Sequence, residues 1–411
     1  MRGTLRRKSE DTWQLRIFRG RDESGRQLFD YHAIHARTKR EAEAASTSLL
    51  HSLDTGGYVE PSALLVRDYL ERWLTEYAAH NVAPYTFDRY CEIVRRHLIP
   101  ALGAVRLNQL TPVRIQRYYA HALESGRLKP LRPKSVAGKT LEPITSLSGQ
   151  TVLHHHRVLR VALKRAVRLG LLVANPCDRL DAPRAAHVEM HAIDELETER
   201  LLAFARRDAH PSFYPAVLLA ANTGLRRGEA LGLRWSDIDT ERGVLTVNRT
   251  LQEPTSGMVF REPKSATSRR VLALDDDTLA ELKAHRARQN ERRLAVGAEW
   301  RDNGLVCPGE FGEPWRPQLF SQTYRRFCKR VGIKLRFHDL RHSHASQLIR
   351  AGAPAKVVQE RLGHASAGFT LTTYGHLLPG MQAEAVSRLS EARAEARVKL
   401  AEEERKAAAE G

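Results

Sequence analysis

The spacing of apolar residues changes along the chain, and this change limits what the chain can fold into. Near the amino terminus, apolar side chains alternate with polar ones, as Trp13, Leu15 and Ile17 do, which is typical of a half-buried strand. From about residue 61 they recur every three or four residues, as on one face of a helix. The chain has 411 residues. At roughly 100–200 residues per domain, this length predicts two or three domains rather than one core.

Residues 1–55 are predicted to form a small sheet that ends in a helix. After a polar turn the alternation resumes, with Phe29, Tyr31 and Ala33 as the apolar positions. The segment TKRE, which begins at Thr38, has the pattern of a capping box and predicts the start of a helix. The first 40 residues carry 11 Lys and Arg against 5 Asp and Glu, a net charge of +6. A basic three-stranded sheet suits a DNA groove; a small solubilising cap is the alternative.

Residues 61–184 are predicted to be all-helical. Thr111-Pro112 is a helix cap with proline at the first helical position, and Ser148 is placed to cap a last helix that Gly170 ends. Pro100 is expected to close the second helix. The first two apolar stripes consist of Val66, Leu70, Trp73, Leu74 and Tyr77, and of Tyr90, Ile93, Val94, His97 and Leu98.

Residues 125–149 interrupt this helical pattern. They are rich in Gly, Pro and Ser without a period, so we expect a long exposed loop or insertion whose basic residues are available to phosphates. The consecutive residues His154, His155 and His156 point in different directions on a helix, which argues against a shared metal. The helix after the insertion has a face of cations only, which favours phosphate contact over an ordinary solvated face. That face consists of Arg157, Arg160, Lys164, Arg165 and Arg168.

After Pro183 the pattern becomes mixed α/β. The runs at 244–248 and 270–274 predict strands. The tail from Met381 is rich in Ala, Glu and Arg and is helix-prone. Helices are predicted at 194–208, 213–221, Asp275 to about Arg293, 317–330, 338–351 and 354–362.

The charge balance points to a polyanionic partner. The chain has 66 Lys and Arg against 48 Asp and Glu, a net charge of +18, and nucleic acid is the commonest large polyanion. No apolar stretch approaches the roughly 20 residues of a membrane span, and no apolar run follows the basic amino terminus, so we expect neither a membrane segment nor a secretory signal. The four cysteines lie far apart, which argues against a disulfide framework or zinc site and fits a reducing cytoplasm.

The first cluster that carries candidate chemistry is the segment NTGLRRGEALGLRWSDID, which begins at Asn222. Gly224 marks a sharp turn into a helix that presents Arg226 from its amino-terminal end, and a guanidinium fork suits phosphate oxygens. Glu229 lies three residues further on the same face and is placed to orient that arginine.

The second cluster, FHDLRHSHA, places His338 and Arg341 three residues apart on a helix, so that they project together. His338 and His342 have the spacing of a zinc pair. However, the glutamate of the zinc motif and a third ligand are missing. A third cluster puts His364 after a helix end and Tyr374 ten residues later. A tyrosine attacks phosphorus where nearby cations stabilise its phenolate and the transition state.

Taken in order, T-G-L-R-x-G-E, a basic β-hairpin, H-x-x-R, L-G-H and T-x-Y-x-H resemble the tyrosine recombinase (phage integrase) family. The resemblance covers essentially the whole chain and is most specific over 187–380. It implies a multidomain protein. The expected parts are a small arm-type DNA-binding domain of three strands and a helix at 1–55, an all-α core-binding domain at 61–184, a mixed α/β, mainly α, catalytic domain at 187–380, and a helical tail at 381–411.

The resemblance also implies a catalytic set and its roles. Arg226 and Arg341 would clamp the scissile phosphate, with Glu229 supporting Arg226. Tyr374 would attack phosphorus, giving a 3′-phosphotyrosine and a free 5′-hydroxyl. Lys264, in PKSATSRR between two predicted strands, would protonate the leaving oxygen; contact with the DNA backbone alone is the alternative.

In the same set, His338 would assist proton transfer, and His364 would hydrogen-bond the phosphate. The covalent bond to tyrosine conserves the energy of the phosphodiester, so no cofactor or metal is expected. The absence of a Walker A sequence and of a carboxylate metal cluster agrees with this expectation.

The family suggests what the protein works with. We expect double-stranded DNA attachment sites of core type and arm type, a homotetramer on DNA, and a host DNA-bending protein and an excisionase as accessory partners. The amino-terminal module favours an integrase of a phage or other mobile element, in the cytoplasm of a bacterial host and associated with its nucleoid. The alternatives are a Xer-like resolvase, a type IB topoisomerase-like strand transferase, and a non-catalytic DNA-binding protein.

Overall fold

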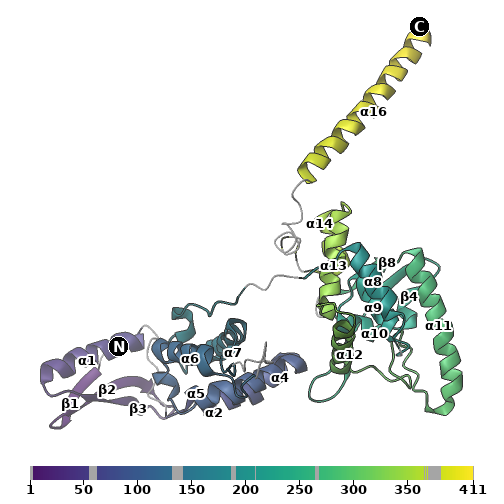
Figure 1. Ribbon diagram of the computed structural model, residues 1–411. Coiled ribbons are helices and arrows are strands. Elements are labelled where there is room, and N and C mark those ends of the chain that lie inside the picture. Colours follow the sequence, from purple (N-terminus) through teal and green to yellow (C-terminus); the bar gives the residue numbers. More distant parts are fainter. Residues whose placement is uncertain are drawn as a thin grey trace. The chain divides into compact units, whose positions relative to one another are not determined.

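The computed structural model describes residues 3–54, 63–131, 142–186, 191–208, 210–263, 268–364, 366, 368 and 381–410. The chain forms two compact units, Met1–His187 and Val188–Gly411. Figure 1 follows the chain from a three-stranded sheet with a helix, through a group of helices, to a mixed α/β region and a last long helix. The expected fold class, multidomain and mainly helical, is confirmed.

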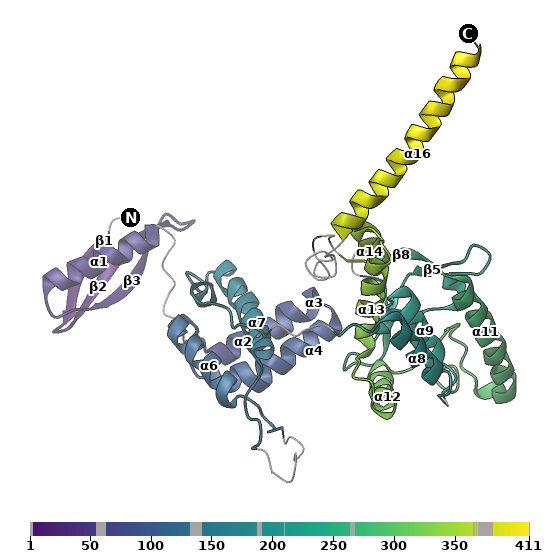
Figure 2. The ribbon, with the colours of Figure 1, turned by 45° about the horizontal axis from the view of Figure 1, so that its top comes forward.

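The amino-terminal sheet packs one face against a single helix (Figure 2). Trp13, Leu15 and Ile17 are buried on that face, as the alternation predicts. The predicted capping box is present, because the Thr38 hydroxyl accepts from the Glu41 amide while the Glu41 carboxylate accepts from the Thr38 amide. The elements are β1 (Gly3–Ser9), β2 (Thr12–Arg21) and β3 (Gln27–His35), antiparallel in the order β1-β2-β3, and α1 (Lys39–Asp54).

In the third strand, the buried side is the one opposite to the apolar positions Phe29, Tyr31 and Ala33. Ile34 pairs with Trp13 and is buried, whereas Tyr31 pairs with Arg16 and remains 58% exposed. The guanidinium of Arg16 lies 3.4 Å from the centre of the Phe29 ring on the same outer face. The alternation of Phe29, Tyr31 and Ala33 therefore predicts the strand. However, the register with β2 turns the even-numbered residues of β3, and not these three, toward the core.

The helical part of the first unit contains two helices with a π-helical segment inside each. Pro100 does not close the second helix as predicted, since α5 continues to Leu102. Proline cannot donate the usual i→i−4 bond, and the wider π turn over Val94–Leu98 directly precedes it. The elements are α2 (Val66–Trp73), η1 (Leu74–Ala78), α3 (Ala79–Asn81), α4 (Pro84–Ile93), η2 (Val94–Leu98), α5 (Ile99–Leu102), η3 (Leu107–Gln109), α6 (Pro112–Ser125), α7 (Gly149–Arg168) and η4 (Pro176–Arg179).

The predicted caps of α6 and α7 are confirmed. The Thr111 and Ser148 hydroxyls each accept from the third amide of the helix that follows, and Gly170 takes a left-handed φ of +70° just after α7.

The insertion between these two helices is closed at its base by backbone hydrogen bonds. The Leu131 amide donates to the Ile144 carbonyl, and the Ile144 amide donates to the Leu131 carbonyl. Residues 132–141 lie outside the described part.

The consecutive histidines of α7 serve packing. His155 and His156 are buried and bond to the hydroxyls of Tyr118 and Tyr119 at 2.7 Å and 3.0 Å, while the exposed His154 bonds to Gln150. Burial lowers the pKa of His155 to about 4, so its ring is neutral at physiological pH.

The second unit is built around α9, which contacts α8, α10, α11 and α13. Its strands form a sheet in the order β4-β5-β8 and a separate hairpin, β6-β7. The helical tail is α16 (Met381–Glu410). The other elements are α8 (Glu195–Ala205), α9 (Phe213–Thr223), α10 (Arg227–Gly232), η5 (Trp235–Asp237), β4 (Ile238–Asp239), β5 (Val244–Val247), β6 (Thr250–Gln252), β7 (Val259–Arg261), β8 (Arg270–Ala273), α11 (Asp276–Val296), η7 (Gly297–Glu299), α12 (Pro317–Arg330), α13 (Phe337–Arg350) and α14 (Ala355–Leu362).

Candidate active site

A glycine turn presents the first candidate arginine. Helix α9 ends at Gly224, whose φ of +68° is left-handed, and Arg226 is the N-cap of α10, as the sequence predicts. A Cβ on Gly224 would lie 2.6 Å from the Leu362 side chain and 3.1 Å from the His344 ring. Glycine is therefore required both for the backbone angle and for the close approach of α13 and α14.

Glu229 holds Arg226 from the first turn of α10. Its carboxylate accepts from the Arg226 backbone N–H at 2.9 Å and from Arg226 Nη1 at 2.8 Å. It also accepts two bonds from Arg270, the first residue of β8. Burial alone would raise the pKa of Glu229, but the hydrogen bonds and charge of Arg270, followed by those of Arg226, lower it to about 2. The carboxylate is thus ionised at physiological pH.

Helix α13 carries the second arginine and a histidine. Arg341 is 2% exposed, and its Nη1 donates to the Gly224 carbonyl at 2.7 Å while its Nη2 donates to the Leu362 carbonyl. His338 lies one turn earlier, and its ring meets that of His342 edge to face at 5.0 Å. Burial, then the neighbouring His342 and Arg341, lowers the pKa of His338 to about 4, so its ring is a neutral proton acceptor at physiological pH.

His364 follows the end of α14. Gly363 ends the helix in a left-handed conformation with φ of +63°. The His364 amide donates to the Gln359 carbonyl, and the Gln359 side chain donates back to the His364 carbonyl. Burial, then Arg341 and Arg226, lowers the pKa of His364 to about 4. The neutral ring keeps one N–H donor and one acceptor.

Four of the six predicted catalytic residues lie in the described part, and the structure brings their elements together. Arg341 donates to the carbonyls of Gly224 and Leu362, and Arg226 donates to the Gly363 carbonyl, next to His364. The charges of both arginines lower the pKa of His338. Lys264 and Tyr374 lie outside the described residues.

Two further arginines complete the frame and were missed in the sequence. Arg270 follows Arg269 in an ordinary basic run, and nothing in that run indicates its bond to Glu229. Arg361 donates to His344 Nε2 at 2.9 Å and to the carbonyls of Ala273 and Asn222, and so ties α14 to β8 and α9. The only sequence signal was its position in the R-L-G-H motif.

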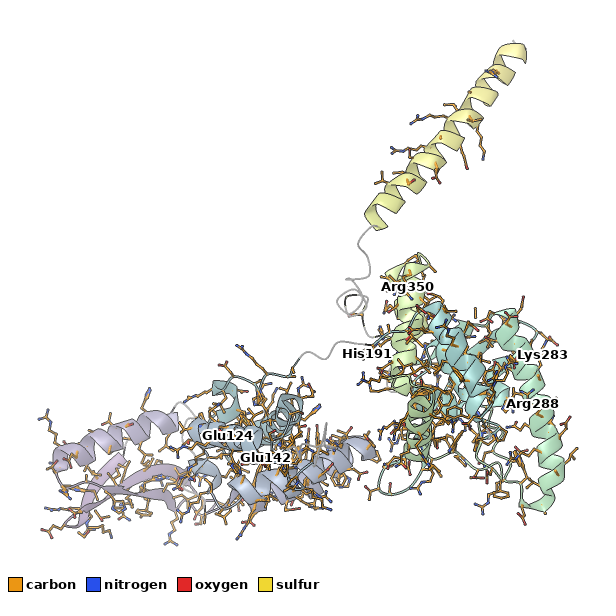
Figure 3. All side chains as sticks on the ribbon, viewed as in Figure 1. Glu124, Glu142, His191, Lys283, Arg288 and Arg350 are labelled. Carbon is orange, nitrogen blue, oxygen red and sulfur yellow. The ribbon has the colours of Figure 1, made fainter. Side chains whose placement is uncertain are left out.

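On α11 of the same unit, Lys283 and Arg288 are exposed (Figure 3). Among the described residues, no group of three or more His, Cys, Asp or Glu side chains is placed to hold a metal ion. Within the same residues, no helix is long and apolar enough to cross a membrane.

The predicted basic face of α7 divides into two kinds of cation. Arg160 pairs with Asp178 at 2.6 Å, and the half-buried Arg165 stacks over the Tyr77 ring at 4.8 Å. Arg157, Lys164 and Arg168 are exposed along the helix. These three exposed cations form the α7 stripe.

Comparison with protein families gives two matches. Residues 191–380 match the phage integrase family, and residues 65–123 match the N-terminal SAM-like domain of phage integrases. A tyrosine recombinase XerC-like protein of Caldanaerobacter subterraneus subsp. tengcongensis is 27% identical over 399 residues, covering 93% of this chain and 96% of its own length. An integrase of Saccharopolyspora erythraea is 23% identical over 449 residues, covering 95% of this chain and 96% of its own length.

Solved structures show the same fold. The Tn1549 transposon integrase in complex with transposon right end DNA has a TM-score of 0.63 and 20% identity, covering 80% of this chain and all of that one. A lambda integrase dimer bound to a COC′ core site has a TM-score of 0.52 and 16% identity, covering 90% of this chain and 94% of that one. Fold, site and family matches agree: the chain belongs to the phage integrase family, the tyrosine recombinases.

Proposed function

We propose that the protein is a site-specific DNA recombinase, an integrase of a phage or other mobile element, that cleaves and rejoins DNA through a 3′-phosphotyrosine. The observation that carries the proposal is the convergence of Arg226, Arg341 and His364, from three separate segments, on the Gly224 turn and the end of α14. Two positioned guanidiniums beside a neutral imidazole suit the non-bridging oxygens of a phosphodiester and the charge that develops on them.

In the proposed reaction, the Tyr374 hydroxyl oxygen forms a bond to phosphorus as the bond from phosphorus to the 5′ oxygen breaks. The tyrosine proton passes to His338, whose lowered pKa leaves it neutral and able to accept. Lys264 supplies a proton to the departing 5′ oxygen, for which arginine is unsuited because its pKa is too high. Attack by a 5′-hydroxyl on the phosphotyrosine reverses the step, so no external energy source is consumed.

The flanking parts support binding to duplex DNA. We propose that residues 61–184 bind core-type sites, with the α7 stripe contacting phosphates, and that residues 1–55 bind arm-type sites. Strand exchange between two sites requires four subunits, which we propose assemble on DNA with a host bending protein and an excisionase. The place of action would be the nucleoid in the bacterial cytoplasm. A Xer-like resolvase is the second candidate, because a XerC-like protein is among the relatives that match over nearly full length.

The test is covalent trapping on a nicked duplex built from DNA that flanks the gene. We expect wild-type protein to accumulate as a covalent protein–DNA complex, with Tyr374 as the linked residue on peptide mapping. Tyr374→Phe should bind the same DNA and form no such complex, because the nucleophilic oxygen is missing. A complex that persists in Tyr374→Phe would overturn the assignment of the nucleophile. Recombination between two attachment sites, compared with relaxation of a plasmid without them, distinguishes an integrase from a topoisomerase.

A further inference from the structure

Three arginines from different elements end on three consecutive carbonyls. Arg270 Nε donates to the Arg361 carbonyl at 2.7 Å, Arg341 Nη2 donates to the Leu362 carbonyl, and Arg226 Nη2 donates to the Gly363 carbonyl at 3.3 Å. The last carbonyls of a helix have no partner within the helix and carry the negative end of its dipole. The end of α14 therefore binds one guanidinium at each carbonyl, in the order Arg270, Arg341 and Arg226.

Arg270, like Arg226, connects the end of α14 to Glu229, but it uses all three of its guanidinium nitrogens to do so. Its Nη1 and Nη2 donate to the two Glu229 oxygens at 3.2 Å and 2.8 Å, while its Nε holds α14. Only 5% of its side chain is exposed, against 39% for Arg226. Four of its five N–H donors bond to Glu229 and to the Arg361 and Ser268 carbonyls, so the guanidinium sets the position of the carboxylate that holds Arg226.

We propose that Arg270 is a positioning residue for DNA cleavage: it locks Glu229 between β8 and α14, so that Arg226 meets the scissile phosphate in one orientation. This inference rests on the function proposed above. Lysine would replace Arg270 only in part, because an ammonium supplies the positive charge but lacks the fork that serves two carboxylate oxygens and a carbonyl together.

A consequence follows for the ionisation of Glu229. The charged side chains that face it are Arg226, from its own helix, and Arg270, from β8; His364 lies near both arginines. Without Arg270, burial acts against only one cation and raises the pKa of Glu229 from its present low value. As the pH falls, the carboxyl then takes up a proton and releases Arg226, so the variant loses rate toward acid pH relative to wild type.

The experiment compares Arg270→Met with Arg269→Met. Arg269 is the adjacent residue, is exposed, and pairs with the exposed Glu262 at 3.3 Å, so it is a matched control for charge and position in the sequence. On the nicked duplex, we expect Arg270→Met to lower the maximal rate of covalent complex formation about 100-fold, the effect of a displacement of about 1 Å in a reacting group. The DNA concentration for half-maximal rate should change little, and Arg269→Met should cleave at nearly the wild-type rate.

The pH profile separates positioning from a general loss of structure. The ratio of the Arg270→Met rate to the wild-type rate should fall between about pH 8 and about pH 5.5, and adding Glu229→Gln should remove that dependence. Arg270→Lys should recover part of the rate. A ratio that does not change with pH, or an Arg270→Met rate equal to wild type, would overturn the proposal.

A second measurement does not depend on cleavage. The ¹³C-carboxyl signal of Glu229, assigned from its loss in Glu229→Gln, should not titrate above about pH 4 in the wild type and should titrate there in Arg270→Met. If neither wild type nor Arg269→Met forms a covalent complex, the proposed function fails. The titration still decides whether Arg270 holds Glu229, and an unchanged titration in Arg270→Met overturns this inference separately.

Discussion

The buried arginines of the second unit and the α7 stripe of the first use the same kind of charge in opposite ways. Arg341 and Arg270 are almost fully buried, and each donates to named carbonyl or carboxylate oxygens from two other elements. Arg157, Lys164 and Arg168 point from one helix into solvent. A guanidinium fixed by neighbours is oriented before substrate arrives, whereas an exposed cation adapts to a phosphate at the cost of its rotamer freedom.

Among the substitutions that test this comparison, Arg341→Ala is expected to have the largest effect on cleavage and stability. The Gly224 and Leu362 carbonyls lose the Arg341 donor. In the proposed mechanism, the scissile phosphate also loses one charged donor. We expect cleavage to fall by roughly 10²–10³-fold and the free energy of unfolding to fall by about 1–3 kcal/mol for each buried acceptor left unpaired. Covalent trapping and urea unfolding measure the two effects. Wild-type stability in this variant would show that the carbonyl bonds do not hold the site together.

Gly224→Ala tests whether the close approach of the turn to α14 matters. Gly170, at the end of α7, has nearly the same left-handed φ, +70° against +68°, but nothing within 4 Å of an added Cβ. Gly170→Ala should therefore cost only the backbone strain, about 1 kcal/mol. Gly224→Ala adds a contact of 2.6 Å with Leu362 and should cost about 2–4 kcal/mol in total.

Thermal unfolding of the two glycine variants gives the difference directly, and covalent trapping reports the site. Only Gly224→Ala should also slow cleavage, because the added methyl separates the turn from α14. Equal losses of stability in the two variants would mean that the turn has room which the structure does not show.

The smallest effects are expected in the α7 stripe. Replacing Arg157, Lys164 and Arg168 with Gln should lower the slope of log K against log salt by about 0.9 for each phosphate that is no longer neutralised. The cleavage rate at saturating DNA should stay the same, because every candidate catalytic residue belongs to the second unit. Lys283→Gln, an exposed substitution on α11, is the control (Figure 3). An unchanged salt slope in the triple variant would remove the stripe from the DNA interface.

Much of the fold could be predicted from local rules. The cap at Ser148, the left-handed Gly170 and the turn at Gly224 act within a few residues, so their patterns are visible in the sequence. The side of β3 that is buried depends on its register with β2, which the alternation of apolar residues within β3 does not reveal. The helix continues past Pro100 because of a π turn, which the rule that proline ends a helix does not predict.

The site divides in the same way. Arg226 and Glu229 share one helix turn, and His338 and Arg341 another, so their spacing was readable. The Glu229–Arg270 pair joins residues 41 apart in sequence. Likewise, Arg160 of α7 is exposed as predicted, but the sequence does not indicate that it pairs with Asp178 or that Arg165 stacks over Tyr77. Pairing partners contributed by other elements are the part that a single sequence does not specify.

The shared helix end of α14 sets a rule for building chimaeras of this enzyme. Because Arg270, Arg341 and Arg226 end on its last three carbonyls, α10, β8, α13 and α14 must be exchanged together. A graft that carries α14 alone would bring in a helix end shaped for another set of guanidiniums. The catalytic unit is transferable only as one piece, so altered site preference is best sought in the amino-terminal sheet and the helical part, which share none of these bonds.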